Sequence, residues 1–220
     1  MTIAALSLSN ALPPVSHVLC LGAHADDIEI GCGGTILALL EAQPRLAMTW
    51  VVFSAEGPRA EEARQSEKRF LSGNERAQVM IKGFRDGFFP YTGGQIKESF
   101  EELKRTMSPD LVFTHYRHDL HQDHRLIAEL TWNTFRDHLV LEYEIPKYGG
   151  DLGVPNFFVP LDASLCLRKL DMVLRTFKSL EDKAWFSEDL LRSLLRLRGM
   201  ECHAPSNYAE AFYARKLVAC

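Results

Sequence analysis

Residues 17–35 read HVLCLGAHADDIEIGCGGT, and this stretch decides the fold. The apolar run His17–Ala23 is short and is followed by a histidine and other polar residues, which is typical of a buried strand. A polar cluster, His24–Glu29, comes next, and three glycines follow it: Gly31, Gly33 and Gly34. The pattern predicts a strand, a polar loop and then a helix over Thr35–Gln43 that Pro44 ends.

Strand and helix signals alternate along the rest of the chain. Short apolar runs predict further strands over Leu46–Phe53, Val79–Lys82 and Leu111–Thr114. Amphipathic patterns predict helices over Ala60–Leu71, Gln95–Met107, Asp162–Leu180 and Ser187–Arg198. Such alternation indicates an α/β fold, a Rossmann-like and mostly parallel sheet flanked by helices, with the active site at the C-terminal ends of the strands. We expect the two C-terminal helices to cover that site.

The composition is that of an ordinary globular domain. The 220 residues are 46% hydrophobic and 25% charged, so we expect a single domain over residues 1–220, with a flexible start over residues 1–14. A net charge of −4 without a long basic tract argues against a nucleic-acid partner. No apolar run approaches the roughly 20 residues that span a bilayer, so we expect no membrane span.

The cysteines indicate the compartment. They are five in number, scattered along the chain and without a CxxC pair. This pattern argues against a disulfide framework and against a cysteine-built zinc site, and it favours a reducing cytoplasm. A homo-oligomer is compatible with the sequence, which does not indicate the oligomeric state.

Two polar clusters follow predicted strands and concentrate the histidines. The first is His24-Ala-Asp26-Asp27, and the second, HYRHDLHQDH, runs from His115 to His124; together they hold five of the eight histidines. A catalytic zinc site commonly takes three imidazole or carboxylate ligands and keeps one position open for water. Because both clusters lie at strand ends, they can meet and supply such a site, and the adjacent aspartates offer one ligand and one base.

Other interpretations of these clusters stay open on the residues alone. An aspartate in HADD can cap the following helix, and the second cluster can be a solvated loop in which Asp123 caps a helix. The glycines after the first strand also suggest a dinucleotide-binding turn, but GxGxxG needs a glycine at position 36, where Ile36 stands. Acidic residues before the glycines would also repel a pyrophosphate, so metal binding is the better interpretation.

The two clusters resemble the motifs of the PIG-L/LmbE-like N-deacetylase family, whose members de-N-acetylate GlcNAc-phosphatidylinositol and the glucosaminyl precursors of mycothiol and bacillithiol. The family's AHPDDxxxGxGGT corresponds to Ala23–Thr35, and its DxHxDH to Asp119–His124. Ala25 stands where the family usually has proline, a change that loosens the turn but removes no ligand. Weaker similarities are an RxxE helix at Arg64–Glu67, a GxxDG turn at Gly83–Gly87 and a C-terminal segment at Tyr208–Phe212.

The resemblance implies one divalent metal ion, held by His24, Asp27 and His124. Two imidazoles and a carboxylate around an open position suit zinc, although iron, cobalt or manganese could use the same ligands. Asp26 would then be the general base that takes a proton from a water molecule at the metal.

The resemblance also implies roles for four further residues. His121 would face the scissile amide and, as an imidazolium, stabilise the oxyanion and protonate the leaving amine. Asp123 would orient His121 and help to hold its proton. Arg64 and Asp86 are the expected contacts to the sugar hydroxyls.

We therefore expect a zinc-dependent hydrolase that removes the N-acetyl group from an acetamido sugar, a GlcNAc-type moiety, and releases acetate and a free amine. The partner is then a small N-acetylated sugar or sugar conjugate. Two alternatives stay open: an amidase or deacylase that acts on a larger sugar conjugate, and a non-catalytic sugar- or metal-binding domain. The second is disfavoured because Asp26 and all three expected ligands are present.

Overall fold

The computed structural model describes residues 15–217, and within them seven strands form one sheet in the order β3-β2-β1-β4-β5-β7-β6. The strands are β1 (His17–His24), β2 (Ala47–Ser54), β3 (Ala77–Ile81), β4 (Leu111–His115), β5 (Leu139–Tyr143), β6 (Phe157–Pro160) and β7 (Ala209–Ala214). The first five are parallel, and β7 runs antiparallel to both of its neighbours. The predicted mostly parallel α/β sheet is confirmed. Residues 1–14, where a flexible start was expected, lie outside the described residues.

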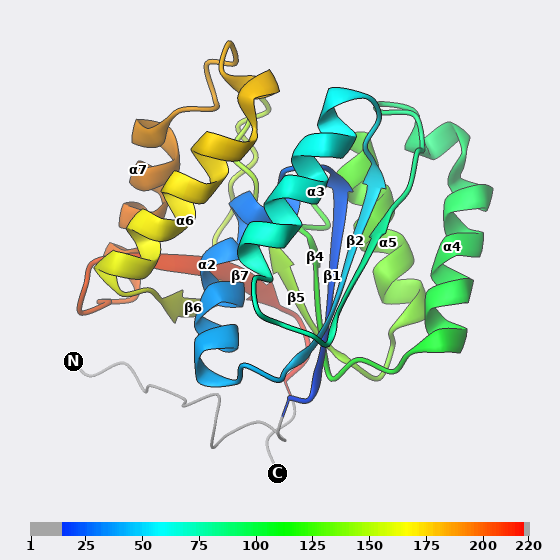
Figure 1. Ribbon diagram of the computed structural model, residues 1–220, viewed down its shortest axis with the longest axis horizontal. Helices are drawn as coiled ribbons and strands as arrows, with labels where there is room; N and C mark the ends of the chain where they lie inside the picture. Colours follow the sequence, from blue (N-terminus) through cyan, green and yellow to red (C-terminus); the bar gives the residue numbers. More distant parts are fainter. Residues whose placement is uncertain (1–14, 218–220) are drawn as a thin grey trace.

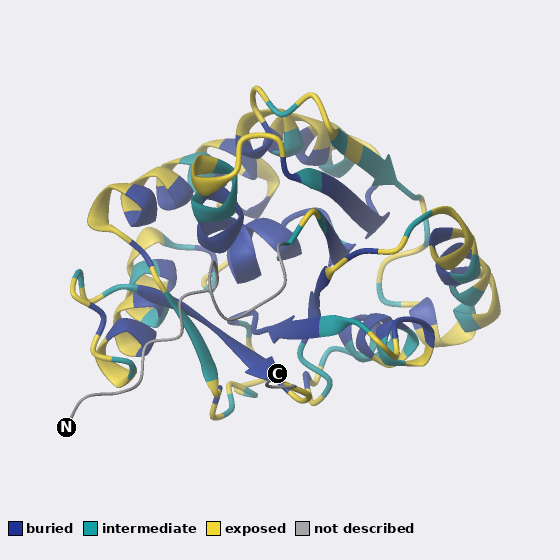
Figure 2. Ribbon diagram, turned by 90° about the horizontal axis from the view of Figure 1, so that it is seen from below, coloured by how far each residue is buried: buried dark blue, intermediate teal, exposed yellow. Residues whose placement is uncertain are grey.

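Helices cover both faces of the sheet (Figure 1). They are α2 (Asp27–Ala42), α3 (Pro58–Phe70), α4 (Gly93–Thr106), α5 (Gln122–Thr134), α6 (Ala163–Thr176) and α7 (Glu188–Glu201), with short 3-10 turns η1 (Phe89–Tyr91) and η2 (Lys178–Leu180). One apolar layer joins the sheet to α2, α3, α6 and α7, and a second joins it to α4 and α5. The central strands are buried between these layers (Figure 2). Among residues 15–217, every helix is too short or too polar to cross a bilayer.

The strand order reverses at the centre of the sheet. Strand β1 pairs with β2 on one side and with β4 on the other, so the chain crosses over in opposite directions from this point. In open α/β sheets, ligands bind beyond the carboxyl ends of the strands at such a switch point. The two polar clusters found in the sequence directly follow β1 and β4, and the topology therefore brings them together.

Helix α2 begins earlier than predicted, because it starts at Asp27 and contains all three glycines. Glycine lowers helix propensity, so the sequence suggested a loop there. The structure gives the reason for the glycines: a Cβ on Gly31 would lie 2.2 Å from the ring of Tyr143, and one on Gly34 would lie 2.4 Å from Leu161. The glycines allow α2 to approach its neighbours closely.

A buried ion pair holds α2 against α6 and β7. Glu210 accepts hydrogen bonds from the backbone N–H groups of Gly34 (2.7 Å) and Thr35 (2.6 Å), and Lys169 Nζ lies 2.6 Å from the same carboxylate. Lys169 also donates to the carbonyl of Ile30 at 2.6 Å. In an α-helix the Gly34 N–H would pair with that carbonyl. The C-terminal segment of sequence similarity, Tyr208–Phe212, therefore contains a residue, Glu210, that contacts α2 for a structural reason.

Replacing Gly31 by alanine should destabilise the protein, because the new methyl group would overlap the ring of Tyr143. Overpacking of this kind costs about 1–3 kcal/mol. Gly94→Ala is the matched control, since it stands in α4 and no atom lies within 4 Å of the place that its new methyl group would take. We expect this second variant to be at least as stable as the wild type. Urea unfolding of both variants tests this, and a wild-type midpoint for Gly31→Ala would contradict it.

Candidate metal centre and active site

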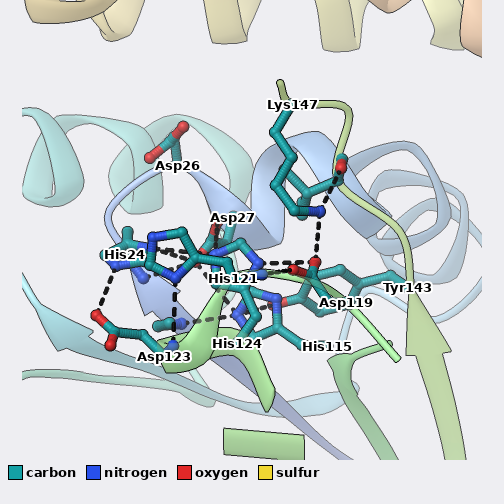
Figure 3. A network of polar contacts seen from close by, with 12 residues as sticks. His24, Asp26, Asp27, His115, Asp119, His121, Asp123, His124, Tyr143 and Lys147 are labelled. Carbon is teal, nitrogen blue, oxygen red and sulfur yellow. Dashed lines mark hydrogen bonds and ion pairs between the residues drawn. The ribbon is translucent and has the colours of Figure 1, made fainter. Parts of the chain in front are cut away.

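The loops after β1 and β4 converge on a cavity of about 700 Å³. His24, Asp26, Asp27, His121 and His124 all line it, so the structure brings the expected ligands and catalytic residues together (Figure 3). Other walls come from the loops after β2, β3 and β5. The two C-terminal helices, α6 and α7, were expected to cover the site. The segment that connects them lines the cavity instead, through Leu180, Lys183 and Trp185.

The side chains of the three predicted ligands lie close to one another. His24 Nδ1 lies 3.1 Å from His124 Nε2 and 3.3 Å from Asp27 Oδ2, and His124 Nε2 lies 3.5 Å from Asp27 Oδ1. Ligands that surround zinc tetrahedrally at 2.0–2.1 Å are roughly 3.4 Å apart. The three residues predicted to bind the metal therefore lie close enough to share one ion, although the two contacts of Asp27 come from different oxygens.

Three overlapping groups of side chains in the described part of the chain have donor atoms within 4.8 Å of one another: His24, His121 and His124; His24, Asp86, His121 and Asp123; and Asp27, His115 and His124. His115 is fully buried, does not line the cavity, and accepts a hydrogen bond on Nε2 from the Ala23 N–H at 2.9 Å. Its lone pair is thus engaged, and its ring stacks on that of His124. His115 therefore supports the candidate ligand His124 by packing against its ring.

A carboxylate that was not assigned a role from sequence orients His124. Asp119 Oδ2 accepts from Nδ1 of His124 at 2.9 Å and from Lys147 Nζ at 2.7 Å, and its Oδ1 accepts from the His121 N–H at 2.7 Å. Burial opposes the charge of Asp119, but the contacts to His124 and Lys147 hold its pKa well below the usual range. A histidine ligand commonly donates its second N–H to a carboxylate in this way. Asp119 stands in the quoted DxHxDH motif, whereas no sequence signal indicated Lys147.

The electrostatics of the site favour a cation. Burial, with neighbouring His115, lowers the pKa of His124 to about 4, so its imidazole is neutral near pH 7. Burial would raise the pKa of Asp27, but the surrounding imidazoles outweigh it and hold the pKa well below 3.8. Burial would lower the pKa of His24, yet Asp27 and two further carboxylates raise it well above 6.5. The ionised carboxylates favour a cation, and without metal the protonated His24 supplies that positive charge, so a metal ion binds at His24 only when the ring loses its proton.

Asp26 occupies the N-cap position of α2 but makes no capping hydrogen bond with its side chain. The capping interpretation left open for HADD is therefore wrong for this residue. Its carboxylate instead pairs with the guanidinium of Arg59. Asp26 is only 4% exposed, and burial raises its pKa despite the charge of Arg59. A buried carboxylate with a raised pKa, open to the cavity, is suited to accept a proton.

The contacts of His121 differ from those expected. Its Nδ1 accepts a hydrogen bond from the backbone N–H of Asp123 at 3.2 Å, so it caps helix α5. The Asp123 carboxylate, which was expected to orient the ring, accepts from the N–H groups of Gly87 (2.7 Å) and Phe89 (3.1 Å) and lies 3.3 Å from His24 Nε2. Burial lowers the pKa of His121. Burial therefore disfavours the expected imidazolium in the resting protein, and because Nδ1 is an acceptor the neutral ring carries its proton on Nε2.

Of the two expected sugar contacts, the structure brings one to the cavity. Asp86 lines it, with Oδ1 3.0 Å from His24 Nε2. Arg64 is exposed on α3 and does not line the cavity, so its expected substrate contact is not supported. Arg59, in the first turn of α3, is the arginine that reaches the cavity. Arg59 and Glu62 also satisfy the RxxE spacing, which is the signal that could have identified them.

The sequence matches a known family over its first half. Residues 19–135 match the family model described as PIG-L, GlcNAc-PI de-N-acetylase. This chain belongs to the PIG-L family. The matched residues include both polar clusters and the loops after β2 and β3 that line the cavity, whereas Lys147 and the connection between α6 and α7 lie outside them.

Solved structures share the fold over nearly the whole chain. N,N′-diacetylchitobiose deacetylase from Pyrococcus horikoshii has 21% identity and a TM-score of 0.71, with 94% of this chain and 86% of that one covered. The A40926 pseudoaglycone deacetylase Dbv21 has 16% identity and a TM-score of 0.70, with 90% and 96% covered. GalB, the 4-carboxy-2-hydroxymuconate hydratase from Pseudomonas putida KT2440, has 16% identity and a TM-score of 0.68, with 93% and 98% covered.

The ligand set can be tested by metal content. We expect Asp27→Asn and His124→Ala to lose the tightly bound ion, because each removes one of three closely spaced donors. His121→Ala should keep one equivalent, and His118→Ala, at an exposed position, is the histidine control. Elemental analysis after loading with one equivalent of zinc and dialysis gives the result. Loss in His121→Ala with retention in Asp27→Asn would instead support the three-histidine set.

Proposed function

We propose that this protein is a zinc-dependent N-deacetylase that removes the acetyl group from an acetamido sugar of the N-acetylglucosamine type and releases acetate and a free amine. The observation that carries the proposal is one cavity in which the side chains of the three predicted metal ligands lie close together beside a buried carboxylate, Asp26, that does not cap its helix. Membership of the PIG-L family supports it, as do two structural relatives that are deacetylases of glycosides.

The fold by itself does not select this reaction, since the hydratase GalB shares it. Folds of this kind host many chemistries, and function depends on the site. In the proposal, His24, Asp27 and His124 hold the ion, and zinc is preferred because the donors are two imidazoles and a carboxylate. When bound, such an ion polarises the amide carbonyl and lowers the pKa of a water molecule at its open position toward about 7.

Amide hydrolysis forms a C–O bond from water, breaks the C–N bond and moves one proton from water to the leaving amine. Asp26 is our choice for the group that takes this proton, since burial raises its pKa and it lines the cavity. Arg59 pairs with Asp26 and fixes the direction of the carboxylate. This contact also favours the ionised form of Asp26, and so opposes the rise in pKa that burial causes.

His121 is our choice for the group that faces the amide. Its Nδ1 accepts from the Asp123 N–H, so the neutral ring presents Nε2–H as a donor. Such a donor stabilises negative charge that develops on the carbonyl oxygen. The proton that Asp26 takes from water is the one that goes to the leaving amine, so His121 keeps its own proton. Asp86, whose side chain is 74% exposed within the cavity lining, is placed to accept hydrogen bonds from sugar hydroxyls.

The proposal predicts that Asp26→Asn keeps its zinc but loses activity. Removing a general base should lower kcat by roughly 100-fold to 10,000-fold. Acetate release is measured from a panel of N-acetylated sugars and sugar conjugates, with and without a chelator. Wild-type rates in zinc-loaded Asp26→Asn would reject Asp26 as the base.

The same panel tests the alternatives. Chelator-sensitive release of a larger acid without acetate would assign the amidase of larger conjugates. Absence of any hydrolysis by the zinc-loaded wild type would reject the enzyme and favour a binding domain.

Two of the three arginines of α3, Arg59 and Arg64, provide a matched pair. Arg59→Ala should reduce kcat/KM for the active substrate by at least about 10-fold, because it frees the Asp26 carboxylate from its only ion pair within the described residues. Arg64→Ala removes the same group from an exposed position outside the cavity, and we expect its kcat/KM to stay near the wild-type value. Equal losses in both variants would contradict this assignment.

A further inference from the structure

Lys147, in the loop after β5, lines the cavity but keeps no hydrogen-bond donor for a substrate. Its Nζ lies 2.7 Å from Asp119 Oδ2, 2.9 Å from Asp151 Oδ1 and 3.1 Å from the Ile145 carbonyl oxygen. An ammonium group has three N–H donors, so these three partners engage all of them. The Lys147 side chain is 15% exposed, and water therefore screens its charge only in part. Of the three partners, Asp119 is the one that contacts a candidate metal ligand.

The Asp119 carboxylate divides its two oxygens among three donors (Figure 3). Oδ2 accepts from Lys147 at 2.7 Å and from Nδ1 of His124 at 2.9 Å, whereas Oδ1 accepts from the His121 N–H at 2.7 Å. A contact between two ions is stronger than a contact between an ion and a neutral imidazole, so Lys147 takes up much of the negative charge at Oδ2. His124 therefore donates to a weaker acceptor than an unshared carboxylate would offer.

The acceptor at Nδ1 controls how strongly Nε2 of His124 can bind a cation. A carboxylate that accepts the second N–H of a histidine ligand raises the basicity of the ring, and such partners commonly change metal affinity by about 10-fold to 100-fold. Lys147 weakens this acceptor and also brings a positive charge close to it. Both effects act in one direction, because each lowers the affinity of His124 for a divalent ion.

We propose that Lys147 tunes the candidate metal centre: by sharing Asp119 with His124, it weakens the binding of the ion and leaves more positive charge on it. In the proposed reaction, an ion of higher positive charge polarises the amide carbonyl more strongly. The effect on catalysis rests on the proposed function, whereas the effect on metal affinity does not. Lys147 lies outside residues 19–135, so the family model that covers the three candidate ligands does not contain it.

Zinc affinity, measured by competition with a chelating dye, tests the proposal. We expect Lys147→Met to bind zinc at least about 10-fold more tightly than the wild type, because Oδ2 of Asp119 then accepts from His124 alone. Lys147→Gln, which keeps N–H donors without the charge, should also bind more tightly, and Lys147→Arg should return the affinity to the wild-type value. Damage to the site would weaken binding, so the direction of the change separates tuning from a structural role. Circular dichroism identifies the variants that fold, and equal or weaker zinc binding in a folded neutral variant would overturn the proposal.

Two control variants keep Lys147 and its contact with Asp119. Asp151→Asn removes the charge of another partner of the ammonium, so its zinc affinity should stay at or below the wild-type value. Lys183→Met removes a positive charge from an exposed position in the cavity lining. We expect its zinc affinity to stay within about 2-fold of the wild type, because solvent screens this charge. A gain of about 10-fold in either control would show that the increase does not depend on the sharing of Asp119, and would overturn the proposal.

Acetate release by the zinc-loaded variants tests the catalytic part. In Lys147→Met, kcat should fall by about 10-fold, because the ion carries less positive charge. KM should stay near the wild-type value, since Lys147 has no donor free for the substrate. Tighter zinc binding with an undiminished kcat would overturn the catalytic part. Absence of acetate release by the wild type with every substrate of the panel would reject the proposed function, and the zinc affinities would still decide whether Lys147 tunes the centre.

Discussion

The close approach of helix α2 to the sheet is the constraint on which the rest of the structure depends. Gly31 lies against the ring of Tyr143 in β5, with no room for even a methyl group between them. The hydroxyl of Tyr143 in turn donates to the Leu21 carbonyl in β1 at 2.6 Å. This contact joins the helix to two strands that are not adjacent in the sheet, and it sets where the first residue of α2, the candidate ligand Asp27, comes to lie.

The position of α2 matters because the site is assembled from separate loops at one edge. Asp26 and Asp27 enter from the start of α2, and His121 and His124 enter from the start of α5. Lys147, from the loop after β5, reaches Asp119 and thereby links a third loop to the same hydrogen-bond network. This network holds the side chains of the candidate site close together. Since a hydratase shares the fold, the sheet alone does not indicate the chemistry.

The structure differs from the sequence interpretation where the packing of distant side chains, and not a local sequence pattern, decides the outcome. The sequence interpretation placed the start of α2 too late, because three glycines lower helix propensity. The residues that require Gly31 and Gly34, Tyr143 and Leu161, lie more than a hundred positions away. The sequence interpretation also chose Arg64 although Arg59 has the same RxxE spacing, and only the rotation of α3 relative to the cavity separates the two. The resemblance implied that Asp123 orients His121, whereas the Asp123 carboxylate accepts from the N–H of Gly87.

The sequence by itself determined the alternation of strands and helices, the family and the identity of the candidate metal-binding motifs. These properties depend on local periodicity and on residue types at short fixed spacings, which a single chain displays directly. Only the tertiary structure decided which arginine enters the cavity, which carboxylate orients His124, and that Asp26 faces the cavity instead of capping its helix. These relations join residues from different elements, and their distances arise from the packing of helices on the sheet.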